Sequence, residues 1–174
     1  MIRFHERRQD AAPRYTLVDS PLGELLLVGD GHALTRVDLT ESAGPDPAWT
    51  ADEAPFRDVV DQLRDYFDGR LTDFDLTVAV AGTPFQRRVW HRLADIPYGV
   101  TTSYGALARD LDLPTGAARA VGAANGSNPV PLFLPCHRVV ASSGALTGYG
   151  LGGLTRKRHL LRLESGQLAL DAAA

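Results

Sequence analysis

The apolar pattern of this chain changes at Gly82, and that change limits the folds open to it. Before Gly82, short runs of alternating apolar and polar residues, separated by turn signals, predict β-strands. These runs lie at residues 15–19, 24–28, 32–39 and 74–80. After Gly82, apolar residues recur at the helical period instead. We therefore expect two domains, residues 1–81 and 82–174, in a chain long enough to bury a sizeable core.

The first domain is also predicted to contain one helix. Five apolar residues between Phe56 and Phe67 follow the helical period, while four aspartates occupy the opposite side, and Gly69 is a plausible stop. This pattern predicts an α+β unit in which one helix covers a small antiparallel sheet. No group of residues in this half is typical of a catalytic site.

The second domain is predicted to be mostly helical. Thr83 and Pro84 are typical N-cap and first-turn residues of a helix that ends at Pro97. A last helix is expected at about residues 154–164, after a flexible loop with four glycines between residues 148 and 153. Its buried side is expected to hold three leucines, Leu154, Leu160 and Leu161.

Between these two helices, the pattern predicts a helix-turn-helix. Ser103 can cap a first short helix, and a second one is expected at about residues 116–124. The second helix consists almost entirely of Ala, Gly and Val around one cation, Arg119. Such small side chains let a helix approach a surface closely, with Arg119 projecting from it. A helix packed against a neighbour, with Arg119 merely solvated, is the alternative.

The two halves of the chain carry opposite net charge. Residues 1–80 hold 8 Arg and 16 acidic residues, a net charge of −8, whereas residues 81–174 hold 10 basic and 5 acidic residues, a net charge of +5. A basic half attracts polyanions, so the asymmetry is consistent with binding of nucleic acid or of an acidic partner. A chance division between two domains is the alternative explanation.

Cysteine usage and hydropathy exclude several classes of protein. Cys136 is the one cysteine of the chain, so an intrachain disulfide and a structural zinc site built on several thiolates are both excluded. No apolar run approaches the roughly 18 residues of a membrane helix, and the N-terminus is charged where a signal peptide is apolar. We expect a cytoplasmic protein that does not bind membranes.

Cys136 is also the candidate nucleophile. Three prolines at positions 129, 131 and 135 predict a stiff, extended approach to it, so that Cys136 and His137 point to opposite sides and communicate through a water. A thiol needs a base to become a thiolate, and a histidine base usually has an acid on its other nitrogen. Among the five acidic residues of this half, Glu164 is the best candidate, whereas Asp171 lies near the C-terminus. A buried, inert cysteine is the alternative.

Four motifs in the same order resemble the 6-O-methylguanine-DNA methyltransferase family. They are Ser103-Tyr104, Ala118-Arg119-Ala120-Val121-Gly122, the segment from Asn128-Pro129-Val130-Pro131 to Pro135-Cys136-His137-Arg138-Val139, and Gly148-Tyr149. The resemblance covers about residues 83–165. It implies a ribonuclease H-like first domain and a winged-helix-like second domain, and a protein that takes an alkyl group from guanine in double-stranded DNA and is spent in one turnover.

The resemblance also implies roles for individual residues. Cys136 would accept the alkyl group, His137 would take the thiol proton through a water, and Glu164 would hold His137. Tyr104 would help to rotate the nucleotide out of the duplex and donate a proton toward the guanine. Asn128 would tie the cysteine segment to the recognition helix.

Two further sets of residues follow from the same resemblance. Arg119 would fill the space left in the base stack, next to the other expected DNA contacts, Thr102, Ser103, Tyr104, Ala118, Ala120 and Gly122. The lesion pocket would be lined by Pro131, Val139, Ser142, Tyr149 and Gly150, with the Val139 carbonyl facing the amino group of the base. No cofactor or metal is implied, because the cysteines with which some relatives hold zinc are absent from the first half. We expect a monomer, whose binding along DNA can be cooperative.

This chain departs from the family pattern at two points. The turn between Tyr104 and Arg119, and the stretch between Tyr149 and Leu160, are each one residue longer. The second insertion bears on the width of the lesion pocket. Three other functions are alternatives. The first is a lesion sensor without chemistry, which Cys136 disfavours, and the second is a helix-turn-helix regulator with a structural cysteine. The third is a cysteine hydrolase, for which no oxyanion hole is indicated.

Overall fold

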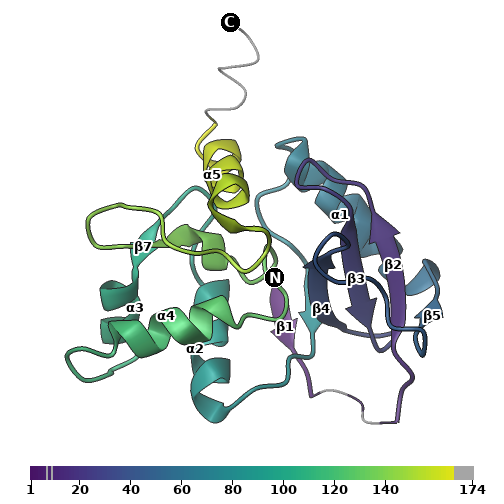
Figure 1. The fold of residues 1–174 in the computed structure, drawn as a ribbon, viewed down its shortest axis with the longest axis horizontal. Coiled ribbons are helices and arrows are strands. Elements are labelled where there is room, and N and C mark those ends of the chain that lie inside the picture. The colour runs from purple at the N-terminus through teal and green to yellow at the C-terminus, as the bar shows by residue number, and fades with distance from the viewer. Residues whose placement is uncertain (7, 9, 167–174) are drawn as a thin grey trace, which may run out of the picture. The chain divides into compact units, whose positions relative to one another are not determined.

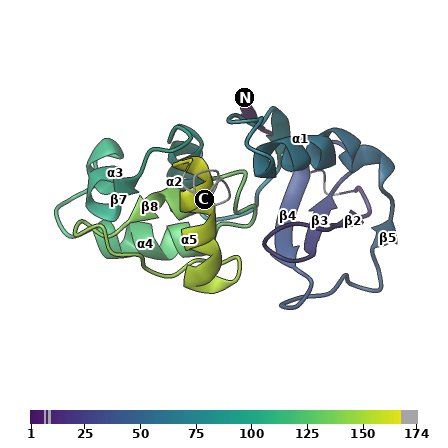
Figure 2. The same cartoon turned by 90° about the horizontal axis from the view of Figure 1, so that it is seen from above.

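The computed structural model describes residues 1–6, 8 and 10–166, and these form two compact units that divide between Ala81 and Gly82. Figures 1 and 2 show a first unit built around a sheet and a second unit that is mainly helical. The fold class predicted from the sequence is confirmed by this arrangement. Among the described residues, no helix has the length and apolar character needed to cross a membrane.

The sheet of the first unit is mixed rather than wholly antiparallel. Within the described residues it has six strands in the order β1-β6-β4-β3-β2-β5. The strands are β1 (Ile2–Phe4), β2 (Arg14–Val18), β3 (Leu25–Gly29), β4 (Leu34–Leu39), β5 (Thr50–Ala51) and β6 (Leu76–Val78). The predicted meander β2-β3-β4 is antiparallel, but β1 and β4 pair with β6 in parallel, as β5 does with β2. The two short strands β1 and β5 have too few residues to show an alternating pattern.

A helix covers this sheet, as the periodicity predicted. A 3-10 turn, η1 (Ala54–Phe56), leads into α1 (Arg57–Phe67), which buries Val60, Leu63 and Tyr66. Figure 2 shows α1 running across one face of the sheet. Together with the fully buried Leu25–Leu27 run of β3, these residues make the core of the first unit.

The second unit begins with α2 (Pro84–Ala94), whose start is fixed by a capping box. Thr83 Oγ1 accepts a hydrogen bond from the Gln86 amide at 3.2 Å, and Gln86 Oε1 accepts one from the Thr83 amide at 2.8 Å. The buried Trp90 donates from Nε1 to the Ala124 carbonyl at 2.8 Å. This bond ties α2 to the second helix of the helix-turn-helix.

The helix-turn-helix consists of α3 (Tyr104–Asp110) and α4 (Ala118–Gly126). Ser103 caps α3 by accepting a hydrogen bond from the Ala106 amide at 3.1 Å. The helix α4 begins two residues later than predicted, because residues 115–117 form a turn in which Gly116 has a φ of +95°.

The residues before Cys136 form a turn, so the prediction of an extended segment there is wrong. The Leu134 amide donates to the Val130 carbonyl at 3.0 Å, and Leu132 has a φ of +80°. Cys136 begins a 3-10 turn, η2 (Cys136–Arg138), followed by β8 (Val139–Val140). Proline fixes its own φ near −65°, which a turn satisfies as well as an extended strand does. The strand β8 pairs in parallel with β7 (Thr102–Ser103), so the cysteine segment lies beside the start of the helix-turn-helix.

The last helix, α5 (Gly153–Glu164), turns Lys157, Leu160 and Glu164 inward. The predicted burial of Leu154 is wrong, since 41% of its surface is exposed. On a helical wheel, Leu154 lies roughly a quarter turn away from the middle of this buried stripe. Leu161 is half-buried at the edge of the stripe.

Candidate active site

The thiol of Cys136 is buried, with 2% of the residue exposed. Burial raises its pKa to about 11, although a hydrogen bond from Asn128 and the charge of Lys157 act in the opposite direction. The thiol is therefore protonated near neutral pH, and a reaction at sulfur needs a base that removes this proton.

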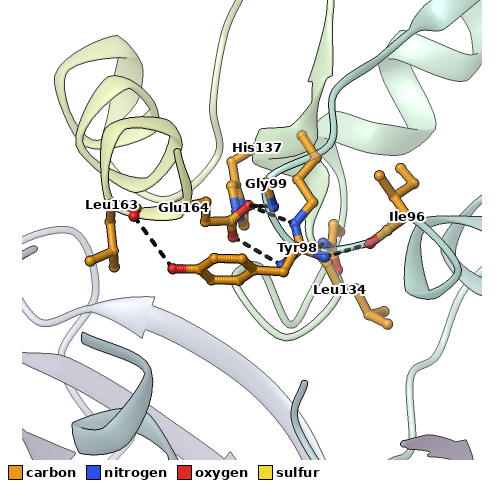
Figure 3. Close-up of polar contacts among 9 residues, drawn as sticks. Ile96, Tyr98, Gly99, Leu134, His137, Leu163 and Glu164 are labelled. Carbon is orange, nitrogen blue, oxygen red and sulfur yellow. Dashed lines mark hydrogen bonds and ion pairs between the residues drawn. The ribbon is translucent and has the colours of Figure 1, made fainter. Parts of the chain in front are cut away.

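Glu164, which was predicted to be the acid that orients His137, lies against this histidine. Glu164 Oε1 is 2.8 Å from His137 Nε2 (Figure 3). Both side chains are completely buried. Glu164 Oε2 also accepts a hydrogen bond from the Gly99 amide at 3.1 Å. The carboxylate at the end of α5 is thereby connected to the histidine of η2.

Arg138 is a second partner of the same carboxylate. Its Nε donates to Glu164 Oε2 and its Nη2 to Glu164 Oε1, both at 2.9 Å. Burial alone would raise the pKa of Glu164, but the hydrogen bonds and charges of His137 and Arg138 outweigh it and hold the pKa at about 2. Glu164 is therefore ionised throughout the neutral range.

An ionised Glu164 determines the tautomer of His137. A carboxylate can only accept hydrogen bonds, so Nε2 carries the hydrogen and Nδ1 keeps a free lone pair. Nδ1 is buried and has no hydrogen-bond partner among residues 1–6, 8 and 10–166. Burial lowers the pKa of His137, and the charges of Arg138 and Lys157 lower it further. The interaction with Glu164 raises this pKa, but the net shift is downward. The imidazole is thus a neutral base with one unoccupied nitrogen.

Asn128 lies at the turn before the cysteine and makes two hydrogen bonds to it. Its Nδ2 donates to the Leu134 carbonyl at 2.7 Å, and its Oδ1 accepts from the Val130 amide at 3.1 Å. Asn125, which the sequence analysis missed, donates from Nδ2 to the Cys136 carbonyl at 3.4 Å. The end of α4 is therefore tied directly to the cysteine.

Tyr104 contacts the loop that follows β8. Its hydroxyl lies 2.8 Å from Thr147 Oγ1. A Cβ atom on Gly122 of α4 would lie 3.7 Å from the Tyr104 ring, so the ring lies next to this small residue. Thr147, a loop residue that was not predicted from the sequence, thus links Tyr104 of α3 to the loop.

The residues expected to contact DNA lie along the helix-turn-helix. Thr102 and Ser103 form β7, and Ser103 caps α3. On α4, Arg119 and Ala120 are exposed, whereas Ala118 and Gly122 are half-buried. The structure brings Arg119 onto the surface of α4 and not to the cysteine.

The residues expected to line the lesion pocket separate into two groups. Pro131, Val139 and Tyr149 are buried, and the Tyr149 ring stands edge-on to that of His137 at a centroid distance of 6.2 Å. Burial raises the pKa of Tyr149 well above its usual value, so the phenol is neutral. Ser142 and Gly150 are exposed, and the Gly150 backbone is so close to α4 that a Cβ there would lie 3.2 Å from the Gly126 carbonyl.

Two buried cations at the site, Arg138 and Lys157, were missed by the sequence analysis as functional residues. Lys157 donates from Nζ to the Val139 carbonyl at 2.7 Å and to the Thr147 carbonyl at 3.1 Å. A signal for Lys157 was available, because it is the one lysine of the chain and lies on the inward stripe of α5. Arg138 is adjacent to His137 within a run of apolar residues.

The described residues include no group of three or more His, Cys, Asp or Glu side chains arranged to hold a metal ion. What the site offers is one thiol, one neutral imidazole, and a carboxylate and a guanidinium that hold the imidazole. Such a set can move a proton from sulfur to nitrogen, which makes the sulfur a nucleophile.

Both units of the chain match domains of known proteins. The ribonuclease-like domain of 6-O-methylguanine DNA methyltransferase matches residues 14–80, and the DNA binding domain of 6-O-methylguanine DNA methyltransferase matches residues 84–166. A methylated-DNA–protein-cysteine methyltransferase of Mycobacterium tuberculosis is 50% identical over 160 residues, which cover 90% of this chain and 95% of the relative. One of Methanosarcina acetivorans is 44% identical over 154 residues, covering 86% and 97%.

Solved structures give the same result. The crystal structure of the M. tuberculosis O6-methylguanine methyltransferase has a TM-score of 0.81 at 49% identity and covers 91% of this chain and 98% of its own. A structure of the M. tuberculosis protein in complex with DNA has a TM-score of 0.83 at 51% identity, covering 88% and 94%.

Proposed function

The chain belongs to the 6-O-methylguanine DNA methyltransferase family, and we propose that it repairs DNA by transferring an alkyl group from guanine to its own Cys136. The observation that carries this proposal is the buried set of Cys136, His137, Glu164 and Arg138. In it, an ionised acid leaves His137 Nδ1 as an unprotonated base beside the one cysteine of the chain.

The chemistry is a direct displacement. His137 Nδ1 takes the thiol proton through a bridging water, and the thiolate attacks the carbon bound to oxygen 6 of guanine. The S–C bond forms as the C–O bond breaks. The electron pair of the broken bond stays on the guanine, toward which Tyr104 donates a proton. The product is a thioether, which is stable, so each chain acts once.

The helix-turn-helix supplies access to the base. A base inside a duplex must be extruded, at a cost of a few kcal/mol. Arg119 is exposed on α4 among small residues, and its planar guanidinium suits the space that the extruded base leaves. Minor-groove edges carry little sequence information, so binding there tolerates any sequence around the lesion. Phosphate contacts supply most of the affinity and make it depend on salt.

The partner in this proposal is double-stranded DNA that contains alkylated guanine, and 4-O-methylthymine is a second substrate to test. The chain acts as a monomer in the cytoplasm, with binding along DNA that can be cooperative, and needs no cofactor. The proposed pocket is lined by Pro131, Val139, Ser142, Tyr149 and Gly150.

Transfer of a labelled methyl group tests the proposal. A duplex with one radiolabelled methyl group on oxygen 6 of guanine is incubated with the protein, and label on protein and on DNA is counted. We expect at most one methyl group per chain, with no turnover, and no transfer to Cys136→Ala. Label that stays on the DNA, or that appears on Cys136→Ala, contradicts the proposal.

A further inference from the structure

The loop between β8 and α5 contains one large apolar side chain among its glycines. Residues 150–153 are Gly-Leu-Gly-Gly, and they lie in the stretch that is one residue longer than the family pattern. Leu151 is 2% exposed, although residues 142–145, 147, 148 and 150 of the same loop are exposed. Within residues 141–152, Tyr149 and Leu151 are the two that are buried. The loop is therefore attached to the second unit through these two side chains.

The backbone around Leu151 forms a tight turn. The Gly153 amide donates to the Tyr149 carbonyl at 3.0 Å, so the turn encloses Leu151. Gly152 and Gly153 both have a φ of +82°, a conformation that residues with a Cβ atom rarely adopt. The two glycines reverse the chain directly after the leucine, and the turn thereby couples the position of Leu151 to that of Tyr149.

Tyr149 depends on this turn because no hydrogen bond holds its ring. Its hydroxyl is buried and has no partner within the part of the chain that the structure describes. The next residue, Gly150, is close to the end of α4, where a Cβ would lie 3.2 Å from the Gly126 carbonyl. These two residues belong to the proposed wall of the lesion pocket, and packing alone keeps the wall in place.

Building on the function proposed above, we propose that Leu151 is a positioning residue that determines the size of the alkyl group accepted. Its buried side chain anchors the turn, and the turn holds Tyr149 and Gly150 against the site. A glycine-rich loop opens at little cost in free energy unless a buried side chain opposes the opening. With the anchor in place, the wall should leave room for a methyl group and disfavour a benzyl group.

Single-turnover transfer from two duplexes tests the proposal. One duplex carries a methyl group and the other a benzyl group on oxygen 6 of guanine, and the ratio of the two rates is measured. We compare the natural protein with Leu151→Ala. Leu154→Ala is the control for loss of an exposed leucine nearby, and Leu93→Ala is the control for loss of a buried leucine from α2.

We expect Leu151→Ala to transfer the benzyl group about five- to twentyfold faster, while the rate for the methyl group changes less than about threefold. Both controls should keep the natural ratio, even though Leu93→Ala unfolds at a lower temperature because it leaves a cavity in the core. An unchanged ratio in folded Leu151→Ala overturns the proposal. If Leu151→Ala does not fold, Leu151→Val replaces it with an expected change of about two- to threefold in the ratio, and an unchanged ratio there is equally decisive.

Hydrogen–deuterium exchange tests the anchor without DNA. We expect the amides of residues 142–150 to exchange about fivefold faster in Leu151→Ala than in the natural protein, because the loop opens more often. Leu154→Ala should exchange like the natural protein, and equal exchange in Leu151→Ala overturns the proposal. Failure of the natural protein to transfer from either duplex refutes the proposed function, and exchange still tests the anchor. Methyl transfer with an unchanged ratio refutes the role of Leu151 alone.

Discussion

The two units of this protein differ in where most of their interacting charged side chains lie. In the sheet unit, charged side chains pair on the surface, as Arg64 and Asp61 do at 3.0 Å with about two thirds of each side chain exposed. In the helical unit, His137, Arg138, Lys157 and Glu164 are buried around one cysteine. Exposed pairs contribute little to stability, whereas buried charges cost much to desolvate. The difference indicates that the second unit keeps its buried charges for chemistry.

The largest expected effect comes from neutralising the buried carboxylate. Glu164→Gln leaves the buried Arg138 without its counter-charge, which should lower the free energy of unfolding by about 3–5 kcal/mol. Methyl transfer should also fall steeply, because His137 loses the acid that selects its tautomer. Urea unfolding and single-turnover kinetics measure the two effects. The control Asp61→Asn, the same change in a surface pair, should leave both unaltered; equal losses in the two variants would remove the distinction between the units.

A second test concerns Arg119, the exposed cation to which we assign a contact with DNA rather than a surface ion pair. Arg119→Ala should slow transfer from duplex DNA by about ten- to a hundredfold, since nothing then fills the space left by the extruded base. Transfer from the free alkylated guanine base should change little. Arg64→Ala in the sheet unit is the control for loss of one positive charge. Equal losses on both substrates would contradict the stack-filling role.

The pH dependence of transfer tests the buried base. Burial lowers the pKa of His137, so Nδ1 should stay unprotonated below pH 6.5, where a free histidine gains its proton. As the pH is lowered, the rate of transfer should therefore be maintained at pH 6.5. It should fall, by about tenfold per pH unit, only in more acidic solution. A rate that is already halved at pH 6.5 would show that His137 titrates like an exposed histidine.

Stability should fall on the acid side for the same reason. A group with a depressed pKa in the folded protein contributes stability that is lost as pH falls, because the unfolded chain binds the proton first. The stability contributed by His137 should be lost below about pH 6.5, and that contributed by Glu164 between pH 4.5 and about 2. Urea unfolding at pH 7, 5 and 3 should show a progressive decrease, and the step below pH 4.5 should be smaller in Glu164→Gln.

The smallest expected effect concerns the hydrogen bond between Tyr104 and Thr147. Thr147→Val keeps the shape of the side chain but removes the hydroxyl that holds Tyr104, so transfer from duplex DNA should slow by about two- to fivefold. Thr147→Ser restores the hydroxyl and should restore the rate. Because Thr147 is exposed, thermal unfolding should be the same in all three proteins. Identical rates for the valine and serine variants would contradict this role.

Much of the fold could be predicted because its signals are local. The capping box at Thr83, the helical period of α1 and α2, and the serine cap of α3 depend on residues within a few positions of one another. The strands β1 and β5 could not be predicted, since each is short and exists only through pairing with distant residues. The turn before Cys136 was missed because prolines are compatible with both conformations.

Two units of opposite net charge, one cysteine, and a helix-turn-helix with a single cation among small residues can all be read from the sequence. It also indicated Glu164 as the acid for His137. That Arg138 shares this acid, and that Lys157 is buried and bonded to the Val139 carbonyl, follows from the folded chain alone. The physical reason is that charge balance in a buried site depends on which side chains meet in space, and η2 and α5 meet only after the chain has folded.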